Sequence, residues 1–234
     1  MCHTGHVGKR QESRDRIEAQ IVTLGRKHLE TEGPAGLSLR AIARDLGMVS
    51  SAVYRYVASR DELLTLLLVD AYSELADTVD RARAVPAPSS RDRLLGMGGA
   101  ARRWAVDQPA RWALLYGSPV PGYHAPAERT VLPGTRVVQA LFDTVAEGVA
   151  AGEVRVPEGV VGQPLSSDFD GLRAEFGFDG GDTLVVRCIA LWAGLVGAIN
   201  LEVFGQYGSD TFTRPALLFD ALFGLLVDEM TGRN

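Results

Sequence analysis

Five side chains that suit contacts with nucleic acid lie close together in the sequence: Ser50, Ser51, Tyr54, Arg55 and Tyr56. Serine hydroxyls can reach base edges or phosphates, whereas tyrosine hydroxyls and arginine guanidinium groups suit phosphate oxygens. A helix from about Ser50 to Val57 would carry these groups on one side and apolar residues on the other. We therefore expect a short helix whose polar side faces DNA.

A second short helix must hold this one in place. Ser38 is a good N-cap for it, and Gly47 stands where it must end in a left-handed residue. Ala43, Gly47 and Val53 then follow the spacing of a helix-turn-helix: a small residue where two helices cross, a glycine in the turn, and a branched apolar residue. The pattern predicts a DNA-reading unit.

The next helix begins at a capping box formed by Ser59 and Glu62, which places its start near Arg60. Arg60 then lies at a helix N-terminus, where backbone amides can also bind phosphate. We expect the helix to run to about Ala84, where the Pro-rich residues 86–90 break it. It is too long to belong to the DNA-reading unit alone and should connect that unit to the rest of the chain.

Charge is distributed unevenly along the chain. The net charge is −5, but residues 1–60 carry ten Lys or Arg and six Asp or Glu, a charge of +4, and the remainder carries −9. A local basic face is enough to attract phosphate. The basic residues before the first helix either touch DNA or form a solvated charge run. The expected DNA contacts are Arg14, Arg40, Ser50, Ser51, Tyr54, Arg55, Tyr56 and Arg60.

Three runs resemble the N-terminal domain of the TetR family of bacterial transcriptional regulators: Leu-Ser-Leu-Arg-Ala-Ile-Ala-Arg-Asp-Leu-Gly (37–47), Ser-Ala-Val-Tyr-Arg-Tyr-Val (51–57) and Ser-Arg-Asp-Glu-Leu-Leu (59–64). The resemblance covers roughly Arg14 to Leu68. Val49 stands where the family usually has a Ser or Thr cap, so we expect the cap to move to Ser50.

The remainder shows helical periodicity and no sustained strand alternation. The predicted helices are Arg91–Val106, Pro109–Tyr116, Glu128–Ala151, Ser167–Phe176, Asp182–Phe204 and Thr213–Met230. Residues 102–123 and 192–205 resemble one C-terminal branch of the TetR family, the WHG-type domain, although Val196 replaces a histidine that is common there. The helical patterns predict an all-α fold with a helix-turn-helix domain at 1–68 and a second domain at 69–234. The resemblance implies that the second domain binds a ligand and dimerises.

Aromatic residues concentrate in this second part, with an asparagine in an otherwise apolar helix. Aromatics with a few polar groups can line a pocket, although most aromatics in such a domain are core residues. Asn200 could instead fix the register of a dimer contact. The predicted ligand pocket comprises Trp104, Trp112, Tyr116, Tyr123, Phe142, Trp192 and Asn200.

The last two helices are apolar over wide faces, and small residues would allow a close approach between helices. Two copies could pack these helices as a four-helix bundle, or burial within one chain could absorb the apolar surface. The predicted dimer interface comprises Leu191, Gly194, Leu195, Gly197, Ala198, Leu222 and Leu225.

Other classes of function find little support. The four histidines form no triad or metal cluster with other residues, and Cys2, His3 and His6 lack a further ligand. No cofactor is expected, and no apolar run or signal segment indicates a membrane. A helical enzyme and an architectural DNA binder remain the alternatives. We expect a cytoplasmic, homodimeric repressor that binds double-stranded operator DNA and is released by a small lipophilic or aromatic effector.

Overall fold

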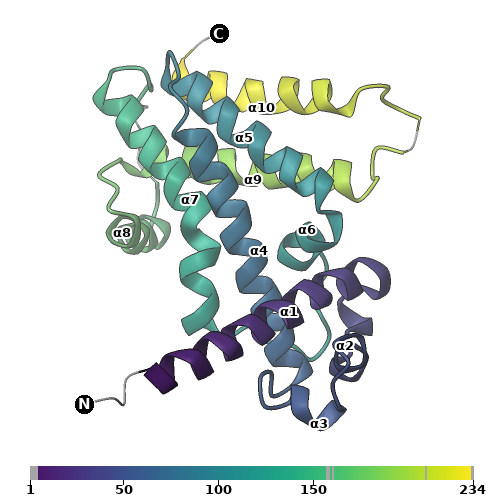
Figure 1. Cartoon of the computed structure of the whole chain (residues 1–234). Coiled ribbons are helices and arrows are strands. Elements are labelled where there is room, and N and C mark those ends of the chain that lie inside the picture. The colour runs from purple at the N-terminus through teal and green to yellow at the C-terminus, as the bar shows by residue number, and fades with distance from the viewer. Residues whose placement is uncertain (1–4, 157–158, 160, 209, 233–234) are drawn as a thin grey trace. The chain divides into compact units, whose positions relative to one another are not determined.

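A computed structural model describes residues 5–156, 159, 161–208 and 210–232. Within these ranges every regular element is a helix, which confirms the predicted all-α class (Figure 1). Cys2 and His3, and the side chain of His6, lie outside the described part. The helices are α1 (Gly5–Gly36), α2 (Leu39–Asp45), α3 (Ser50–Val53), α4 (Arg60–Arg83), α5 (Ser90–Asp107), α6 (Pro109–Tyr116), α7 (Ala127–Ala150), α8 (Leu165–Phe176), α9 (Asp182–Val203) and α10 (Pro215–Thr231).

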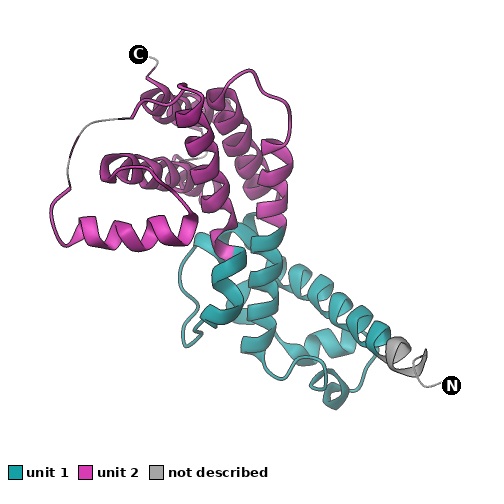
Figure 2. Cartoon of the chain, turned by 90° about the vertical axis from the view of Figure 1, so that its left-hand side faces the viewer, with its two compact units in different colours: residues 1–73, 108–133 teal, residues 74–107, 134–234 magenta. Residues whose placement is uncertain are grey.

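The chain forms two compact units (Figure 2). Unit 1 comprises residues 1–73 and 108–133, and unit 2 comprises residues 74–107 and 134–234. The sequence predicted a single boundary, between residues 68 and 69. Unit 1 instead comprises two stretches of the chain, because residues 108–133, which hold α6, pack with the helix-turn-helix.

Unit 1 is built on a core of aliphatic side chains from α1, α2, α3 and the first half of α4. The two residues predicted to pack the helix-turn-helix, Ala43 and Val53, are fully buried in it. Gly47 has φ 67°, the left-handed conformation expected at the end of α2. Helix α1 bends at Gly33, whose φ is 66°, before Pro34. His28 on α1 contacts the Asp45 carboxylate at 2.7 Å and ties α1 to α2.

Helix α3, the predicted DNA-reading helix and called the recognition helix below, differs from the prediction at both ends. Val49 occupies the N-cap position with extended backbone, no side chain caps the helix, and Ser50 is its first residue. The expectation that the cap moves to Ser50 is therefore wrong. The α-helix ends at Val53 rather than near Val57, because the amides of Arg55 and Tyr56 bond to carbonyls three residues back and close tight turns instead.

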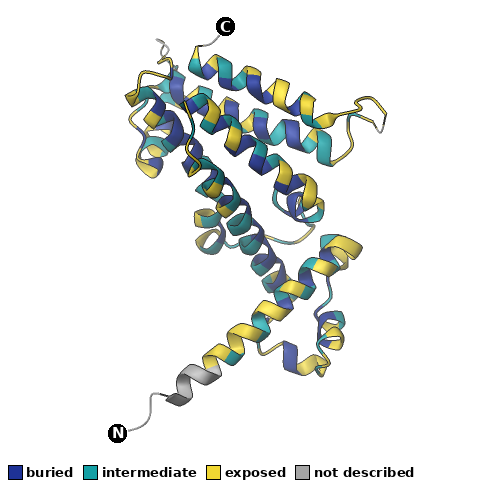
Figure 3. Ribbon diagram, turned by 45° about the horizontal axis from the view of Figure 1, so that its top comes forward, coloured by how far each residue is buried: buried dark blue, intermediate teal, exposed yellow. Residues whose placement is uncertain are grey.

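Unit 2 is a helical bundle in which α5, α9 and α10 pack against one another. Buried residues alternate with exposed ones along these helices (Figure 3). By length and composition α9 is apolar enough to cross a membrane, but residues such as Leu184 and Leu191 are buried in the bundle. Cys188 is also buried there, and burial raises the pKa of its thiol to about 12. It is therefore a packing residue rather than a reactive one.

Candidate DNA interface and effector cavity

The polar side of α3 faces solvent. Ser50, Ser51, Tyr54 and Arg55 are exposed, and the Tyr54 side chain keeps 45% of its accessible surface. The apolar residues Ala52 and Val53 on the opposite side are buried in the core of unit 1. Hydroxyl and guanidinium groups on an exposed helix and the turn that follows it are suited to base edges and phosphates.

The flanking cations lie on three other helices. Arg40 near the start of α2 is exposed. Arg14 on α1 forms a 2.7 Å ion pair with Glu18, and its guanidinium carbon lies 5.9 Å from the centre of the Tyr56 ring. Tyr56 is partly buried, and this cation–π contact joins α1 to the end of residues 50–57, called the recognition segment below.

The Arg60 side chain is partly exposed and contacts the end of α1. Its guanidinium donates to the carbonyl oxygens of Pro34 at 2.7 Å and Ala35 at 3.5 Å. The cap predicted just before it is present, because the Ser59 hydroxyl accepts a hydrogen bond from the Glu62 amide at 3.1 Å. The Glu62 carboxylate does not complete the box and instead binds Arg129.

Three of the predicted pocket aromatics belong to unit 1, where α6 packs against α1. Tyr116 contacts Trp112, with ring centres 4.4 Å apart, and Tyr72, with ring centres 6.3 Å apart. Burial raises the pKa of both Tyr72 and Tyr116 above the ordinary value for tyrosine. Tyr123 packs against the helix-turn-helix core.

A buried arginine lies beside this aromatic group. Arg111 on α6 is 2% exposed and donates to the Asp70 carboxylate at 3.0 Å. Arg26 on α1 donates to the same carboxylate at 2.8 Å. Asp70 on α4 therefore joins α1, α4 and α6 within unit 1.

The other four predicted pocket residues lie in unit 2. Trp104 on α5 donates to the Glu74 carboxylate at 3.1 Å and lines a surface groove of about 460 Å³. Phe142 on α7 is buried and stacks on Phe176 with ring centres 5.1 Å apart. Trp192 and Asn200 on α9 are partly buried. The seven residues are thus divided between the two units.

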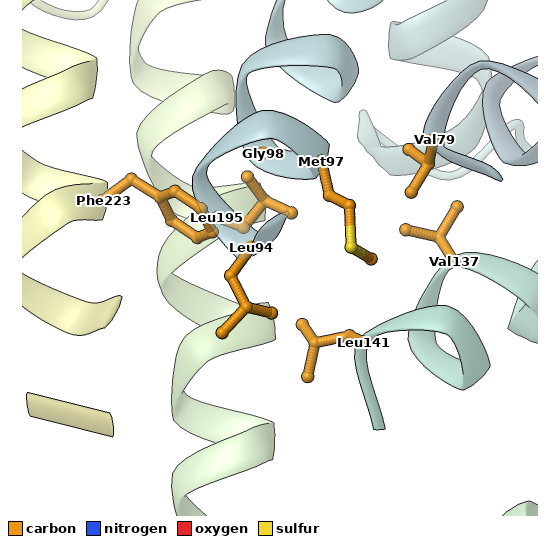
Figure 4. A pocket seen from close by; sticks show the side chains of 8 residues that line it. All are labelled: Val79, Leu94, Met97, Gly98, Val137, Leu141, Leu195 and Phe223. Carbon is orange, nitrogen blue, oxygen red and sulfur yellow. The ribbon is translucent and has the colours of Figure 1, made fainter. Parts of the chain in front are cut away.

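Unit 2 contains an apolar cavity that none of these seven residues lines (Figure 4). Its volume is about 10 Å³, close to the least space that holds one water molecule. An apolar cavity of this kind stays dry. Its lining comes from α4, α5, α7, α9 and α10: Val79, Leu94, Met97, Gly98, Val137, Leu141, Leu195 and Phe223. Sequence reasoning missed these residues because aliphatic side chains at helical spacing look the same whether they line a cavity or fill a core.

The predicted dimer residues fall into two groups. Leu191, Leu195 and Ala198 are buried within the chain, and a side chain at Gly194 would meet Leu226 of α10. By contrast, the space beside the Gly197 Cα is open, Leu222 is 36% exposed and Leu225 is 69% exposed. Further exposed apolar residues on the same two helices are Val186, Ile189, Leu201 and Leu217.

Comparisons with known proteins agree with this architecture. The family described as Tetracyclin repressor-like, C-terminal domain, matches residues 94–226. The HTH-type transcriptional regulators Mb1846 of Mycobacterium bovis and Rv1816 of Mycobacterium tuberculosis are each 64% identical over 228 residues, covering 97% of both chains. The crystal structure of the putative regulatory protein SCO4313 is similar, with a TM-score of 0.75 and 33% identity over 92% of this chain and 97% of that one. The chain therefore belongs to the TetR family of transcriptional regulators.

Proposed function

We propose that the protein is a homodimeric repressor in the bacterial cytoplasm, which binds operator DNA and is released by a small apolar effector. The observation that carries the proposal is the exposed polar side of α3 and the turn after it on a buried helix-turn-helix core, with Ser50, Ser51, Tyr54 and Arg55 turned to solvent. One such helix reads too few bases to specify a site, so regulators of this kind bind two half-sites as a dimer.

The exposed apolar residues of α9 and α10 support the dimer. One helical stripe on α9 comprises Val186, Ile189, Gly197 and Leu201, at successive spacings of three, eight and four residues. Leu217 and Leu225 form a second stripe on α10, eight residues apart. Apolar residues gathered on two packed helices indicate an interface between copies.

The apolar cavity of unit 2 is the proposed effector site. Because every lining residue is apolar, the part of an effector that enters must carry no hydrogen-bonding group. A volume of about 10 Å³ holds no such molecule as it stands. Effector binding must therefore widen the cavity by moving side chains such as Met97 and Phe223, and the ligand selects that wider state.

Helix α4 is the proposed route from the cavity to DNA. Its residue Val79 lines the cavity in unit 2, whereas its residues 60–73 belong to unit 1. The proposed coupling is that a change at Val79 is transmitted along α4 to residues 60–73. The effector is proposed to favour a conformation that operator DNA rejects.

Selection of duplexes from random-sequence DNA by the full-length protein tests DNA binding directly. The expected result is a palindromic site with half-sites about one helical turn apart, bound by a protein that light scattering shows to be a dimer. A thermal-shift screen with apolar compounds, each hit retested for release of that duplex, then tests the effector. A protein that selects no sequence would overturn the proposal.

A further inference from the structure

The segment after α6 contacts the start of α4 through two polar groups. The Tyr123 hydroxyl lies 2.9 Å from the Thr65 hydroxyl. Arg129, in the first turn of α7, places one guanidinium nitrogen 2.8 and 2.9 Å from the two Glu62 carboxylate oxygens. All four residues belong to unit 1. Glu62 and Thr65 are three residues apart, so they lie on one face of α4, just after the recognition segment.

The direction of the tyrosine hydrogen bond follows from the partners of Thr65. The Thr65 hydroxyl donates its single hydrogen to the Asp61 carbonyl at 2.9 Å. The Tyr123 hydroxyl must therefore be the donor to Thr65. Thr65 is 2% exposed, so water cannot readily replace that donor. Tyr123 thus donates a hydrogen bond to a buried acceptor on α4, the Thr65 hydroxyl oxygen.

The ion pair orients α4 more than it stabilises the fold. The side chains of Arg129 and Glu62 are 36% and 35% exposed, and pairs this exposed contribute little to stability. The Glu62 backbone amide is already bound by the Ser59 cap, while the carboxylate turns to Arg129. One guanidinium nitrogen of Arg129 binds both carboxylate oxygens of Glu62, and this contact orients the start of α4 relative to the start of α7.

We propose that Tyr123 and Arg129 are positioning residues of the DNA interface. Together they hold the start of α4, and with it the recognition helix that ends only a few residues earlier, in the orientation that the operator requires. Neither residue needs to touch DNA. The inference rests on the proposed function, because it is tested by measuring the affinity of the protein for a specific DNA duplex.

The test compares a specific duplex with a random one. The specific duplex is the one that the wild-type protein selects from random-sequence DNA, and its scrambled version is the second probe. Arg129→Ala and Tyr123→Phe should each weaken binding of the selected duplex about fivefold, the factor that corresponds to one net hydrogen bond. Binding of the scrambled duplex should stay unchanged, because the groups that contact phosphate remain.

A double-mutant cycle separates positioning from a general structural role. If Arg129 acts through Glu62, the double variant Glu62→Gln/Arg129→Gln should bind the selected duplex no more weakly than Arg129→Gln alone. Arg129→Lys keeps the charge and should recover part of the affinity. The thermal midpoints of the Arg129 and Glu62 variants should stay close to that of the wild type, because this pair is exposed.

Arg136→Ala is the matched control. Arg136 lies on the same helix as Arg129, is equally exposed, and also binds carboxylates of α4, Asp77 at 2.7 Å and Asp80 at 2.6 Å, but within unit 2. The Arg136→Ala variant should bind the selected duplex with the affinity of the wild type.

Wild-type affinity in both Arg129→Ala and Tyr123→Phe, or the same loss in Arg136→Ala, overturns this inference but not the proposed function. Equal loss on both duplexes identifies a direct phosphate contact and also overturns it. A wild-type protein that selects no sequence overturns the proposed function as well.

Discussion

Arg60 donates a hydrogen bond from its guanidinium to the carbonyl oxygen of Pro34, over 2.7 Å. The bond joins the first residue of α4 to the last turn of α1, after the bend at Gly33. Carbonyls at the end of a helix lack hydrogen-bond partners within it. A charged donor such as the Arg60 guanidinium forms a strong hydrogen bond with such a carbonyl. The sequence predicted Arg60 as a phosphate contact, and this geometry adds a structural role.

The first prediction is that Arg60→Ala destabilises the helix-turn-helix. Loss of a charge-assisted hydrogen bond should lower the free energy of unfolding by about 1–2 kcal/mol, measured by urea denaturation. Arg55→Ala is the control, because the exposed Arg55 side chain should affect DNA binding without affecting stability. Unchanged stability in Arg60→Ala, together with a salt slope reduced by about one, would identify Arg60 as a phosphate contact only.

The second prediction separates phosphate contacts from base contacts on α3 and the turn after it. Tyr54→Phe should weaken binding of selected and scrambled duplexes by similar factors, because phosphate contacts position a protein without specifying sequence. Ser51→Ala should instead change the sequence that the protein selects. Repeating the selection with each variant measures both effects. A changed site for Tyr54→Phe would show that the Tyr54 hydroxyl reads a base edge.

The helix-turn-helix could be predicted because its signals are local. Ser38 caps α2 through a bond to the Ala41 amide, Ser59 caps α4, and Gly47 ends α2 with positive φ. Pro109 begins α6 as the sequence predicted. Each of these signals depends on a few neighbouring residues, whose conformational preferences survive in the folded protein.

The pocket and the packing of α6 could not be predicted in the same way. Trp104 and Trp112 are eight residues apart in sequence, yet they belong to different compact units. Arg60 binds a carbonyl 26 residues away, and Arg129 binds a carboxylate 67 residues away. Such partners are chosen by tertiary packing, and helical spacing alone carries no information about them.

The third prediction concerns the dimer face. Leu225→Glu should produce monomers in light scattering, because a carboxylate on the most exposed leucine of α10 would be buried between two copies. Gly197→Leu should do the same, since a side chain there enters open space in the single chain and would meet only a partner.

Gly194→Leu is the contrasting variant. A bulky side chain at Gly194 meets Leu226 within the same chain, so this change should lower stability rather than act first on assembly. Dimers that persist in both Leu225→Glu and Gly197→Leu would place the interface on another surface.

The fourth prediction enlarges the apolar cavity. Leu141→Ala should lower the free energy of unfolding by about 2–5 kcal/mol, because it removes buried methyl groups and leaves a larger void. Small apolar compounds such as benzene should then raise its thermal midpoint by binding the folded state. Leu184→Ala, in the same unit but outside the cavity lining, should be destabilised without recovery by the compounds. Equal recovery in both variants would show that the effect is not specific to the cavity.

The last prediction concerns the link between effector and DNA. Two recognition helices must lie roughly 34–36 Å apart, or a multiple of that, to enter successive major grooves on one face of the duplex. A small rotation of α4 changes that separation, since α4 follows the recognition segment directly and also lines the cavity through Val79. An effector that favours the rotated state must weaken operator binding, and thermodynamic linkage requires the operator to weaken effector binding by the same factor. Calorimetry with the first compound that raises the thermal midpoint, with and without saturating operator, measures that factor. Equal effector affinities under the two conditions would rule out this switch, even for a protein that binds its operator as a dimer.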